Sequence, residues 1–441
     1  MKHVDSIIAA RWILPVRPEN RVLENYALVI NDGVIVDLLA QSEVDKVYTA
    51  NEVFQRDNHV LMPGLINAHT HLGMSYYRGL KDDVTLHTWL SDYIWPAERK
   101  TISAEYVYDA TIHALAECIR GGVTCVNDHY FHMDEVAKAC SNAGVRGVLS
   151  HCIYHFQTPW AKTPDECFSH QEKLIELLKD SQLLSVAIGP HSPYGVNDEI
   201  MQKVYQLSSQ NNLPIHTHLH ETQHEVDEFV SIYGQSPVKH YASKGWLSDR
   251  FIAVHMTALD EEEIELLVEN NVNVVHCPES NMKLSSGISP VQKMLNRGIN
   301  VALGTDGSAS NNDIDMISEM RSASFLAKVA NLNPEDLSAE AVLEMATIAG
   351  AKALKLDEAV GSLEIGKRAD CISVDLLFPE TLPVYHPISQ IVYAASRNQV
   401  NDTWVNGQCL MKDRALLTID EQQLYQKQLN WHEKIQSAVK S

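Results

Sequence analysis

Residues 61–71 read LMPGLINAHTH, a short apolar run that ends in two histidines, His69 and His71. Seven similar runs follow, at residues 122–130 (GVTCVNDHY), 145–152 (VRGVLSHC), 183–191 (LLSVAIGPH), 213–221 (LPIHTHLHE), 251–257 (FIAVHMT), 272–280 (VNVVHCPES) and 299–307 (INVALGTDG). Apolar runs bounded by turn signals are typical of strands buried on both faces, and the stretches between them, such as residues 111–122 and 260–271, have helical periodicity. Eight such units predict an α/β fold, a closed (β/α)8 barrel of the TIM type, whose functional side chains lie at the carboxyl ends of the strands.

Four side chains at these strand ends form a candidate metal site. His69 and His71 lie two residues apart on a predicted strand, so they point to the same side. His218 lies near the end of the fifth run, and Asp306 lies near the end of the eighth. Zinc accepts imidazole nitrogens and a carboxylate oxygen, and a catalytic zinc keeps one position for water. Any one histidine among 21 indicates little, but the joint pattern of H-x-H after a proline-glycine turn, H-x-x-E, a strand-ending histidine and G-T-D predicts a metal centre.

The segments that carry this pattern resemble the amidohydrolase superfamily in its mononuclear-metal deaminase branch. The likeness is greatest to the 5′-methylthioadenosine/S-adenosylhomocysteine deaminases. It covers nearly the whole chain, through residues 63–80, 216–222, 275–290, 304–316 and 361–370. The resemblance implies hydrolytic deamination of an adenosine derivative with release of ammonia. The expected products are 5′-methylthioinosine from 5′-methylthioadenosine, or S-inosylhomocysteine from S-adenosylhomocysteine.

The resemblance also assigns chemical roles to single residues. The four candidate ligands would bind the metal, Glu221 would carry protons, and His255 would orient or deprotonate the attacking water. Asp306 would bind the metal through one oxygen and accept the proton of the water with the other. Deamination needs protonation of the ring nitrogen and of the leaving amine, which suits a single carboxyl group. Because Glu221 is three residues after His218, a continuous strand would point it the wrong way, so we expect the strand to end near Leu219.

The number of metal ions follows from what the fourth run contains. Relatives with two metal ions commonly bridge them with a carboxylated lysine at the end of the fourth strand. Residues 183–195 offer His191 at that place and contain no lysine. We therefore expect one zinc ion per subunit, although Fe2+ is acceptable to the same ligands.

Substrate contacts are assigned by the resemblance to residues outside the metal set. Glu98 would hydrogen-bond the ribose hydroxyls, because one carboxylate accepts two hydrogen bonds. His191 would contact the ribose or the base, Trp89 would cover the sugar or the thioether, and Glu221 would contact the purine. Arg146 is a candidate for binding an amino-acid carboxylate. Three of these residues have an ordinary alternative, which is a solvated charge at a helix end for Glu98, core packing for Trp89 and a helix-strand tie for Arg146.

Other polar residues near the strand ends have open roles. His216 shares a strand face with His218, so it is a candidate for supporting a ligand from behind. His129 and His151 either line the pocket or pack in the core. Ser280, Asn281 and Lys283 are expected to shape the mouth of the barrel, where loops commonly carry functional residues.

The two ends of the chain contain β-strand patterns of their own. A chain of 441 residues exceeds a barrel of about 250 residues. Asp32-Gly33 and Asn406-Gly407 each lie between apolar alternating segments and predict β-hairpins. Neither end is large enough alone, so we expect both to form one small β-sandwich domain, as the resemblance also implies. The expected domains are residues 1–58 with 367–441 for the small domain and its C-terminal helix, and residues 59–366 for the barrel.

The last stretch is expected to be an amphipathic helix. Thr418 and Glu421 form a capping-box pattern. Its apolar face contains Leu424, Trp431, Ile435 and Ala438. We expect this face to pack on the barrel or on another subunit.

Composition limits the partners. The net charge of −22 argues against nucleic acid, because phosphate binding needs clustered Lys and Arg. No apolar run suits a membrane span, and the first residues lack the layout of a signal peptide. Eight cysteines without a C-x-x-C motif are typical of free thiols in a reducing cytosol. We expect a cytoplasmic enzyme with a small-molecule nucleoside substrate, and the family resemblance implies a homo-oligomer.

Two other functions fit parts of the pattern. A related mononuclear enzyme acting on another ring, such as a guanine or 8-oxoguanine deaminase or a triazine hydrolase, would use the same metal core. A non-catalytic structural homologue is the second alternative, but such proteins have lost ligands. Glu221 favours loss of an amine, because ammonia leaves well only when it is protonated and chloride does not need that proton.

Overall fold

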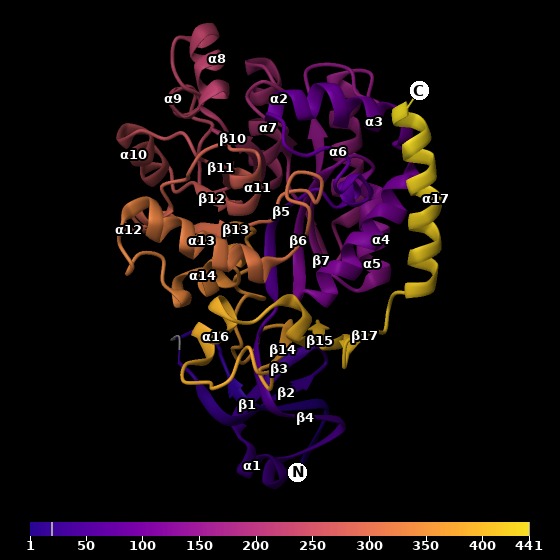
Figure 1. Ribbon diagram of the computed structural model, residues 1–441, viewed down its shortest axis with the longest axis vertical. Coiled ribbons are helices and arrows are strands. Elements are labelled where there is room, and N and C mark those ends of the chain that lie inside the picture. The colour runs from indigo at the N-terminus through magenta and orange to yellow at the C-terminus, as the bar shows by residue number, and fades with distance from the viewer. Residues whose placement is uncertain (19–20, 441) are drawn as a thin grey trace.

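The computed structural model describes residues 1–18 and 21–440, with a β/α barrel above a small β domain (Figure 1). The barrel strands are β5 (Leu65–Thr70), β6 (Val123–Tyr130), β7 (Arg146–Ile153), β8 (Leu184–Val186) with β9 (Gly189–Pro190), β10 (Ile215–Leu219), β11 (Phe251–His255), β12 (Asn273–His276) and β13 (Val301–Leu303). Neighbouring strands pair in parallel, in the orders β5-β6-β7-β8 and β10-β11-β12-β13. Parallel bridges between Ile188 and Ile215 and between Thr70 and Asp306 close the ring. The predicted (β/α)8 barrel is confirmed.

Helices surround the barrel between the strands. They are η1 (Leu72–Tyr77), α2 (Leu86–Thr88), η2 (Trp89–Ile94), α3 (Trp95–Thr101), α4 (Ala104–Arg120), α5 (Met133–Ala143), α6 (Pro164–Leu178), α7 (Asp198–Asn211), α8 (Gln223–Tyr233), α9 (Pro237–Ser243), α10 (Glu261–Glu269), α11 (Pro278–Lys283), α12 (Val291–Asn296), α13 (Met316–Asn331), α14 (Ala339–Met345) and α15 (Ile348–Ala353). Several begin at a side chain that accepts a backbone N–H, as Ser103, Thr163 and Asn197 do. At α10, Asp260 and Glu263 form a complete capping box. Local sequence therefore defines where these helices start.

Strands from both ends of the chain form the small domain. They are β1 (Lys2–Ile13), β2 (Leu23–Asn31), β3 (Val34–Ala40), β4 (Tyr48–Pro63), β14 (Cys371–Asp375), β15 (Val400–Val405), β16 (Gln408–Lys412) and β17 (Ala415–Leu416), with α1 (Gln41–Val47), α16 (Pro387–Tyr393) and η3 (Arg397–Gln399). They make one eight-stranded sheet, ordered β17-β16-β15-β14-β4-β1-β2-β3. The rings of Phe54 and Trp404 meet edge to face at 5.1 Å within its core. The expected pairing of the two ends is therefore present in the structure.

The two predicted hairpins show how this sheet closes on itself. Asp32 and Gly33 have φ values of 52° and 73°, and Asn406 and Gly407 have 52° and 76°, which suits tight turns between strands. The two turns touch, because a Cβ on Gly33 would lie 2.5 Å from the carbonyl oxygen of Asn406. The sandwich is thus one sheet folded back over a shared core. The boundary expected at residue 58 falls inside β4, and the domain limits as a whole stay a prediction.

The C-terminal helix α17 (Glu421–Lys440), yellow in Figure 1, runs along the outside of the barrel. Trp431 is buried against Tyr106 at 5.1 Å, and its indole N–H donates to Asp109 at 2.8 Å. The apolar face therefore packs on the protein's own barrel. The predicted capping box is wrong. The carboxylate of Asp420 accepts the backbone N–H groups of Gln422 and Gln423, and the hydroxyl of Thr418 donates to the carbonyl oxygen of Ala143.

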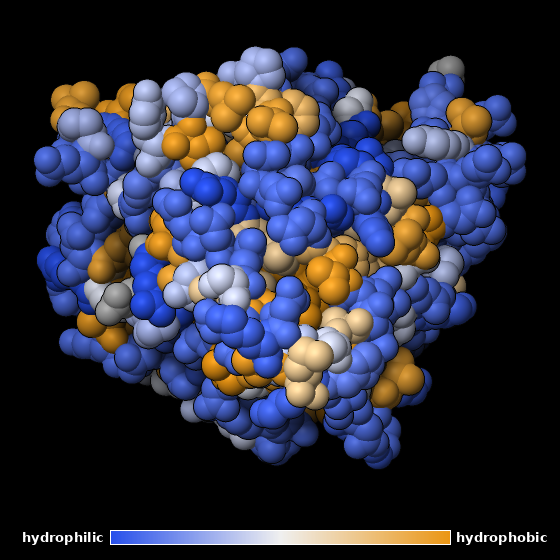
Figure 2. Space-filling model, turned by 90° about the horizontal axis from the view of Figure 1, so that it is seen from below, coloured by the Kyte–Doolittle hydropathy of each residue, from blue (hydrophilic) through white to orange (hydrophobic). Residues whose placement is uncertain are grey.

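The surface seen from below is largely hydrophilic, and its apolar side chains lie in several separate patches (Figure 2). Among the described residues, no helix is both long and apolar enough to cross a membrane. The eight cysteines carry free thiols, and all but Cys409 are buried.

Candidate functional site

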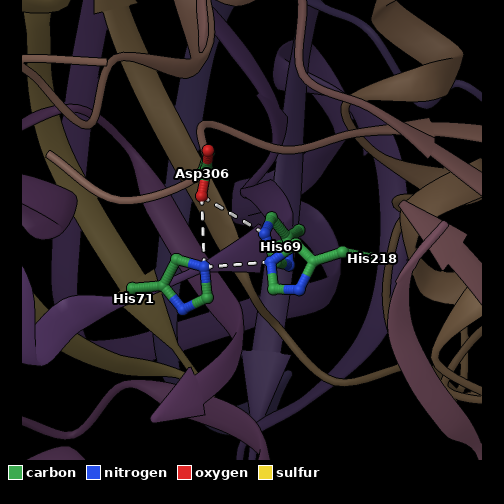
Figure 3. A group of neighbouring side chains, drawn as sticks. All are labelled: His69, His71, His218 and Asp306. Atoms are coloured by element: carbon green, nitrogen blue, oxygen red, sulfur yellow. Dashed lines mark hydrogen bonds and ion pairs between the residues drawn. The ribbon is translucent and has the colours of Figure 1, made fainter. Parts of the chain in front are cut away.

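The four candidate ligands meet at the carboxyl end of the barrel (Figure 3). The Nε2 atoms of His69 and His71 lie 3.3 and 3.2 Å from Oδ1 of Asp306, and Nε2 of His218 lies 3.2 Å from Nε2 of His71. All four ligand atoms lie within 4.8 Å of one another. Ligands about 2.0 Å from a tetrahedral zinc lie about 3.3 Å apart. The arrangement therefore fits one small divalent metal ion.

Backbone carbonyls orient two of the histidine rings. Nδ1 of His71 donates to the carbonyl oxygen of His129 at 2.5 Å, and Nδ1 of His218 donates to that of His191 at 2.6 Å. A carbonyl can only accept, so the proton is on Nδ1 and the lone pair of Nε2 points to the common centre. Metal-binding histidines are commonly held in this way.

His69 is oriented by another histidine. Its Nδ1 lies 2.9 Å from Nε2 of His216, while its own Nε2 is buried and makes no hydrogen bond. Burial lowers the pKa of His69 to about 3, so its ring is neutral, as a ligand must be. His216 therefore contacts a candidate ligand from behind, and its supporting role stays a prediction.

Asp306 is held by hydroxyl groups that the sequence interpretation did not assign. Its Oδ2 accepts from Ser280 at 2.6 Å and from Ser310 at 2.8 Å, and its Oδ1 accepts from the backbone N–H of Gly307 at 2.8 Å. Burial raises the pKa of Asp306, but the adjacent rings of His69 and His71 outweigh it and hold the pKa well below its usual range. The oxygen expected to take the proton of the water already accepts two hydrogen bonds. Ser280 ends the seventh apolar run and Ser310 lies three residues after the eighth, which was the signal available.

Glu221 enters the site through a sharp change in backbone direction. β10 ends at Leu219, as predicted, and His220 adopts a left-handed conformation with φ of 51°. The carboxylate of Glu225 accepts the backbone N–H of His220 at 2.9 Å and that of Glu221 at 3.3 Å. This turn directs the Glu221 side chain inward, where it lines the pocket.

His255 lies beside Glu221 at the end of β11. Its Nδ1 is 2.9 Å from Oδ1 of Asn281, and its buried Nε2 makes no hydrogen bond and lies 3.9 Å from Oε2 of Glu221. Burial, together with the charge of Asp306, raises the pKa of Glu221 to about 8. A carboxyl group with this pKa is suited to both giving and taking a proton near neutral pH.

A pocket opens from this centre. Glu98, His191 and Trp89 line it, as expected of substrate-binding residues. Glu98 is 6% exposed and accepts a hydrogen bond from the hydroxyl of Tyr130 at 2.6 Å, and burial raises its pKa to about 7. His191 stacks on Tyr154 at 4.6 Å, and burial lowers its pKa to about 3. The alternative of a solvated Glu98 at a helix end is wrong.

The substrate role of Arg146 is also wrong. Arg146 is the first residue of β7, at the opposite end of the strand from the site. Its Nε and Nη2 donate to the two carboxylate oxygens of Asp370 at 2.7 and 3.1 Å, and its Nη1 donates to the carbonyl of Gln182 at 3.0 Å. The residue joins the barrel to the start of the small domain, which is the structural alternative.

The remaining polar candidates lie around the pocket without lining it. His129 is buried beside the ligand rings, and His151 stacks on Trp160 at 4.3 Å. The ammonium of Lys283 binds Oδ1 of Asp82 at 2.7 Å. These three residues are not among those that form the pocket wall.

The chain is similar to known proteins over nearly its whole length. The model of the amidohydrolase family matches residues 60–410. A 5-methylthioadenosine/S-adenosylhomocysteine deaminase from Saccharophagus degradans is 41% identical over 98% of this chain and 97% of its own, and one from Pyrococcus furiosus is 41% identical over 91% and 94%. A solved adenosine deaminase from Xanthomonas campestris with bound zinc has a TM-score of 0.98 and 42% identity, and covers 99% of both chains. A zinc-containing atrazine chlorohydrolase from Arthrobacter aurescens has a TM-score of 0.90 over 98% and 100% of the chains, but at 23% identity it indicates the fold alone.

Proposed function

The chain belongs to the amidohydrolase family, and from this premise we infer that it is a hydrolytic deaminase of adenosine derivatives. Water replaces the amino group on the purine ring, and ammonia leaves. The observation that carries this inference is the meeting of the four ligand atoms beside the carboxyl group of Glu221 in one pocket. The names of relatives similar over nearly the full length support the same reaction.

We propose that His69, His71, His218 and Asp306 hold one zinc ion, with Fe2+ as the other metal that these ligands accept. The buried Nε2 of His69, which makes no hydrogen bond, supports this assignment. When bound, such an ion supplies an activated water at neutral pH. The chain itself contributes three imidazoles and a carboxylate whose ligand atoms already converge.

Glu221 and His255 then carry the proton movements. Glu221 donates to the ring nitrogen next to the amino-bearing carbon as that carbon is attacked, takes one proton of the water and passes it to the leaving amine. It recovers the second proton of the water as the new hydroxyl group becomes the carbonyl. His255 holds the water through its free Nε2, because Asn281 keeps the ring in one orientation. Asp306 stays ionised as a ligand and fixes the site electrostatically.

The purine and the sugar occupy successive parts of the pocket. With the amino-bearing edge against Glu221, the sugar extends toward Glu98, whose carboxylate accepts from both ribose hydroxyls. The neutral ring of His191 contacts the base or the ribose, and Trp89 covers the sugar and its 5′ substituent. We also propose that the enzyme is a homo-oligomer and acts in the cytoplasm.

Purified protein loaded with zinc tests this function. We expect it to release ammonia from 5′-methylthioadenosine, S-adenosylhomocysteine or adenosine, with the ultraviolet change from adenine to hypoxanthine, and not from guanine. Removing the metal with a chelator should abolish the reaction, and adding zinc should restore it. Release of ammonia from guanine alone, or from no purine, would contradict the proposal.

A further inference from the structure

The pocket has a polar end and an apolar end. The candidate metal ligands, Glu221 and His255 form the polar end, and Glu98 lies at the sugar position proposed above. The remaining wall consists largely of apolar and aromatic side chains, contributed by α2, η2, α3 and the ends of β6 and β7. These are Leu86, Trp89, Leu90, Ile94, Trp95, Phe131 and Tyr154.

Among the described residues, no lysine or arginine lines this pocket. Its charged members are the acids Glu98, Glu221 and Asp306. Nearby cations are directed elsewhere. Lys283 binds Asp82, and Arg99, next to Glu98 on α3, is exposed whereas Glu98 is buried. Apart from the proposed metal ion at the polar end, the wall therefore offers a bound anion acidic, imidazole and apolar groups, with no lysine or arginine as its partner.

We propose that this pocket selects adenosine derivatives whose 5′ substituent is short, apolar and uncharged, such as the methylthio group. The proposal rests on the deaminase function and narrows its substrate class. S-adenosylhomocysteine carries an ammonium and a carboxylate at the end of its thioether chain. Placing an unpaired carboxylate against apolar walls and neighbouring acids costs free energy, which no interaction in this pocket returns. The methylthio group instead gains from burial against Trp89 and Trp95.

Adenosine analogues with 5′-thioether groups of matched length distinguish the effect of charge on turnover from the effect of size. 5′-Butylthioadenosine has a chain about as long as that of homocysteine but carries no charge. The 2-carboxyethylthio and 3-aminopropylthio analogues have similar length and carry only the anion or only the cation. Measured on the zinc-loaded protein, kcat/KM for S-adenosylhomocysteine and for the carboxylate analogue should be at least about tenfold below that for the butylthio compound. The ammonium analogue should fall between them, because the acids of the pocket tolerate a cation.

The outcomes distinguish this proposal from the deaminase function. If 5′-methylthioadenosine and S-adenosylhomocysteine are deaminated with equal kcat/KM, the selectivity is overturned and the function stands. If the butylthio analogue is as poor as S-adenosylhomocysteine, length and not charge sets the limit, and the proposal is again overturned. If neither these compounds nor adenosine is deaminated while the protein holds zinc, the deaminase function itself fails.

Discussion

Nε2 of His216 lies 2.9 Å from Nδ1 of His69, directly behind the ring that faces the metal position. His216 is fully buried, and its Nδ1 lies 3.5 Å from the hydroxyl of Ser150. The contact fixes the rotation of the His69 ring and leaves Nε2 of His69 for the ion. His216 thus orients a candidate ligand and is not itself among the four converging residues.

Replacing His216 by phenylalanine should weaken metal binding. The phenyl ring fills a similar space but offers no polar atom, so His69 loses the group that orients it. Such losses typically lower metal affinity about 10-fold to 100-fold. Competition with a chromophoric zinc chelator measures this change. His224→Phe is the matched control, because its side chain is 75% exposed on α8 and should leave affinity unchanged. Equal affinity in both variants would show that His216 only packs.

Replacing Glu221 by glutamine should separate metal binding from turnover. The amide keeps the shape of the side chain but cannot carry the proton to the leaving amine, so kcat should fall by at least about 100-fold. Metal analysis should still give one zinc ion per chain, because Glu221 is not among the four converging ligands. Full activity in this variant would exclude the assigned role.

Replacing Arg146 by methionine should reduce stability and leave substrate binding unchanged. The change leaves the buried carboxylate of Asp370 without its partner, which typically costs about 3–5 kcal/mol. Denaturant unfolding measures the loss, and KM for the preferred nucleoside should stay within about twofold, since the residue is far from the chemistry. Arg11→Met is the control, because its ion pair is exposed and contributes less than about 1 kcal/mol. A rise in KM without a loss of stability would restore the original interpretation of Arg146.

Acid should weaken the small domain through Asp402. Burial raises the pKa of Asp402, but hydrogen bonds from Arg56 at 2.7 Å and from Ser373 outweigh it and lower the pKa. A carboxyl group whose pKa is lower in the folded protein than in the unfolded chain stabilises the fold. This stability is present above the pKa of the unfolded chain, about 3.9, and is lost as pH falls through the pKa of the folded protein. Urea midpoints of the wild type should therefore drop steeply below about pH 4. Asp402→Asn should be less stable at pH 7 and show a shallower drop. Parallel pH curves for the two proteins would argue against this linkage.

Local patterns in the chain were enough to predict several features. The apolar runs indicated the barrel strands, because burial on both faces needs apolar residues at nearly every position. The Asp-Gly and Asn-Gly pairs indicated both hairpins, because these residues tolerate positive φ. The end of β10 near Leu219 followed from the geometry of a strand, in which a residue three positions on faces the opposite side.

Contacts between distant segments could not be read from these patterns. Arg146 and Asp370 are 224 residues apart, and Ser280 and Asp306 are 26 apart, so no periodicity relates them. Asp420, and not Thr418, caps α17, because packing of the preceding loop directs the Thr418 hydroxyl to Ala143. The chain thus specifies where each strand ends and which side chain stands there. The partner of each side chain depends on how the closed barrel and the folded sheet bring those ends together, since hydrogen bonds and ion pairs depend on distance in space and not along the chain.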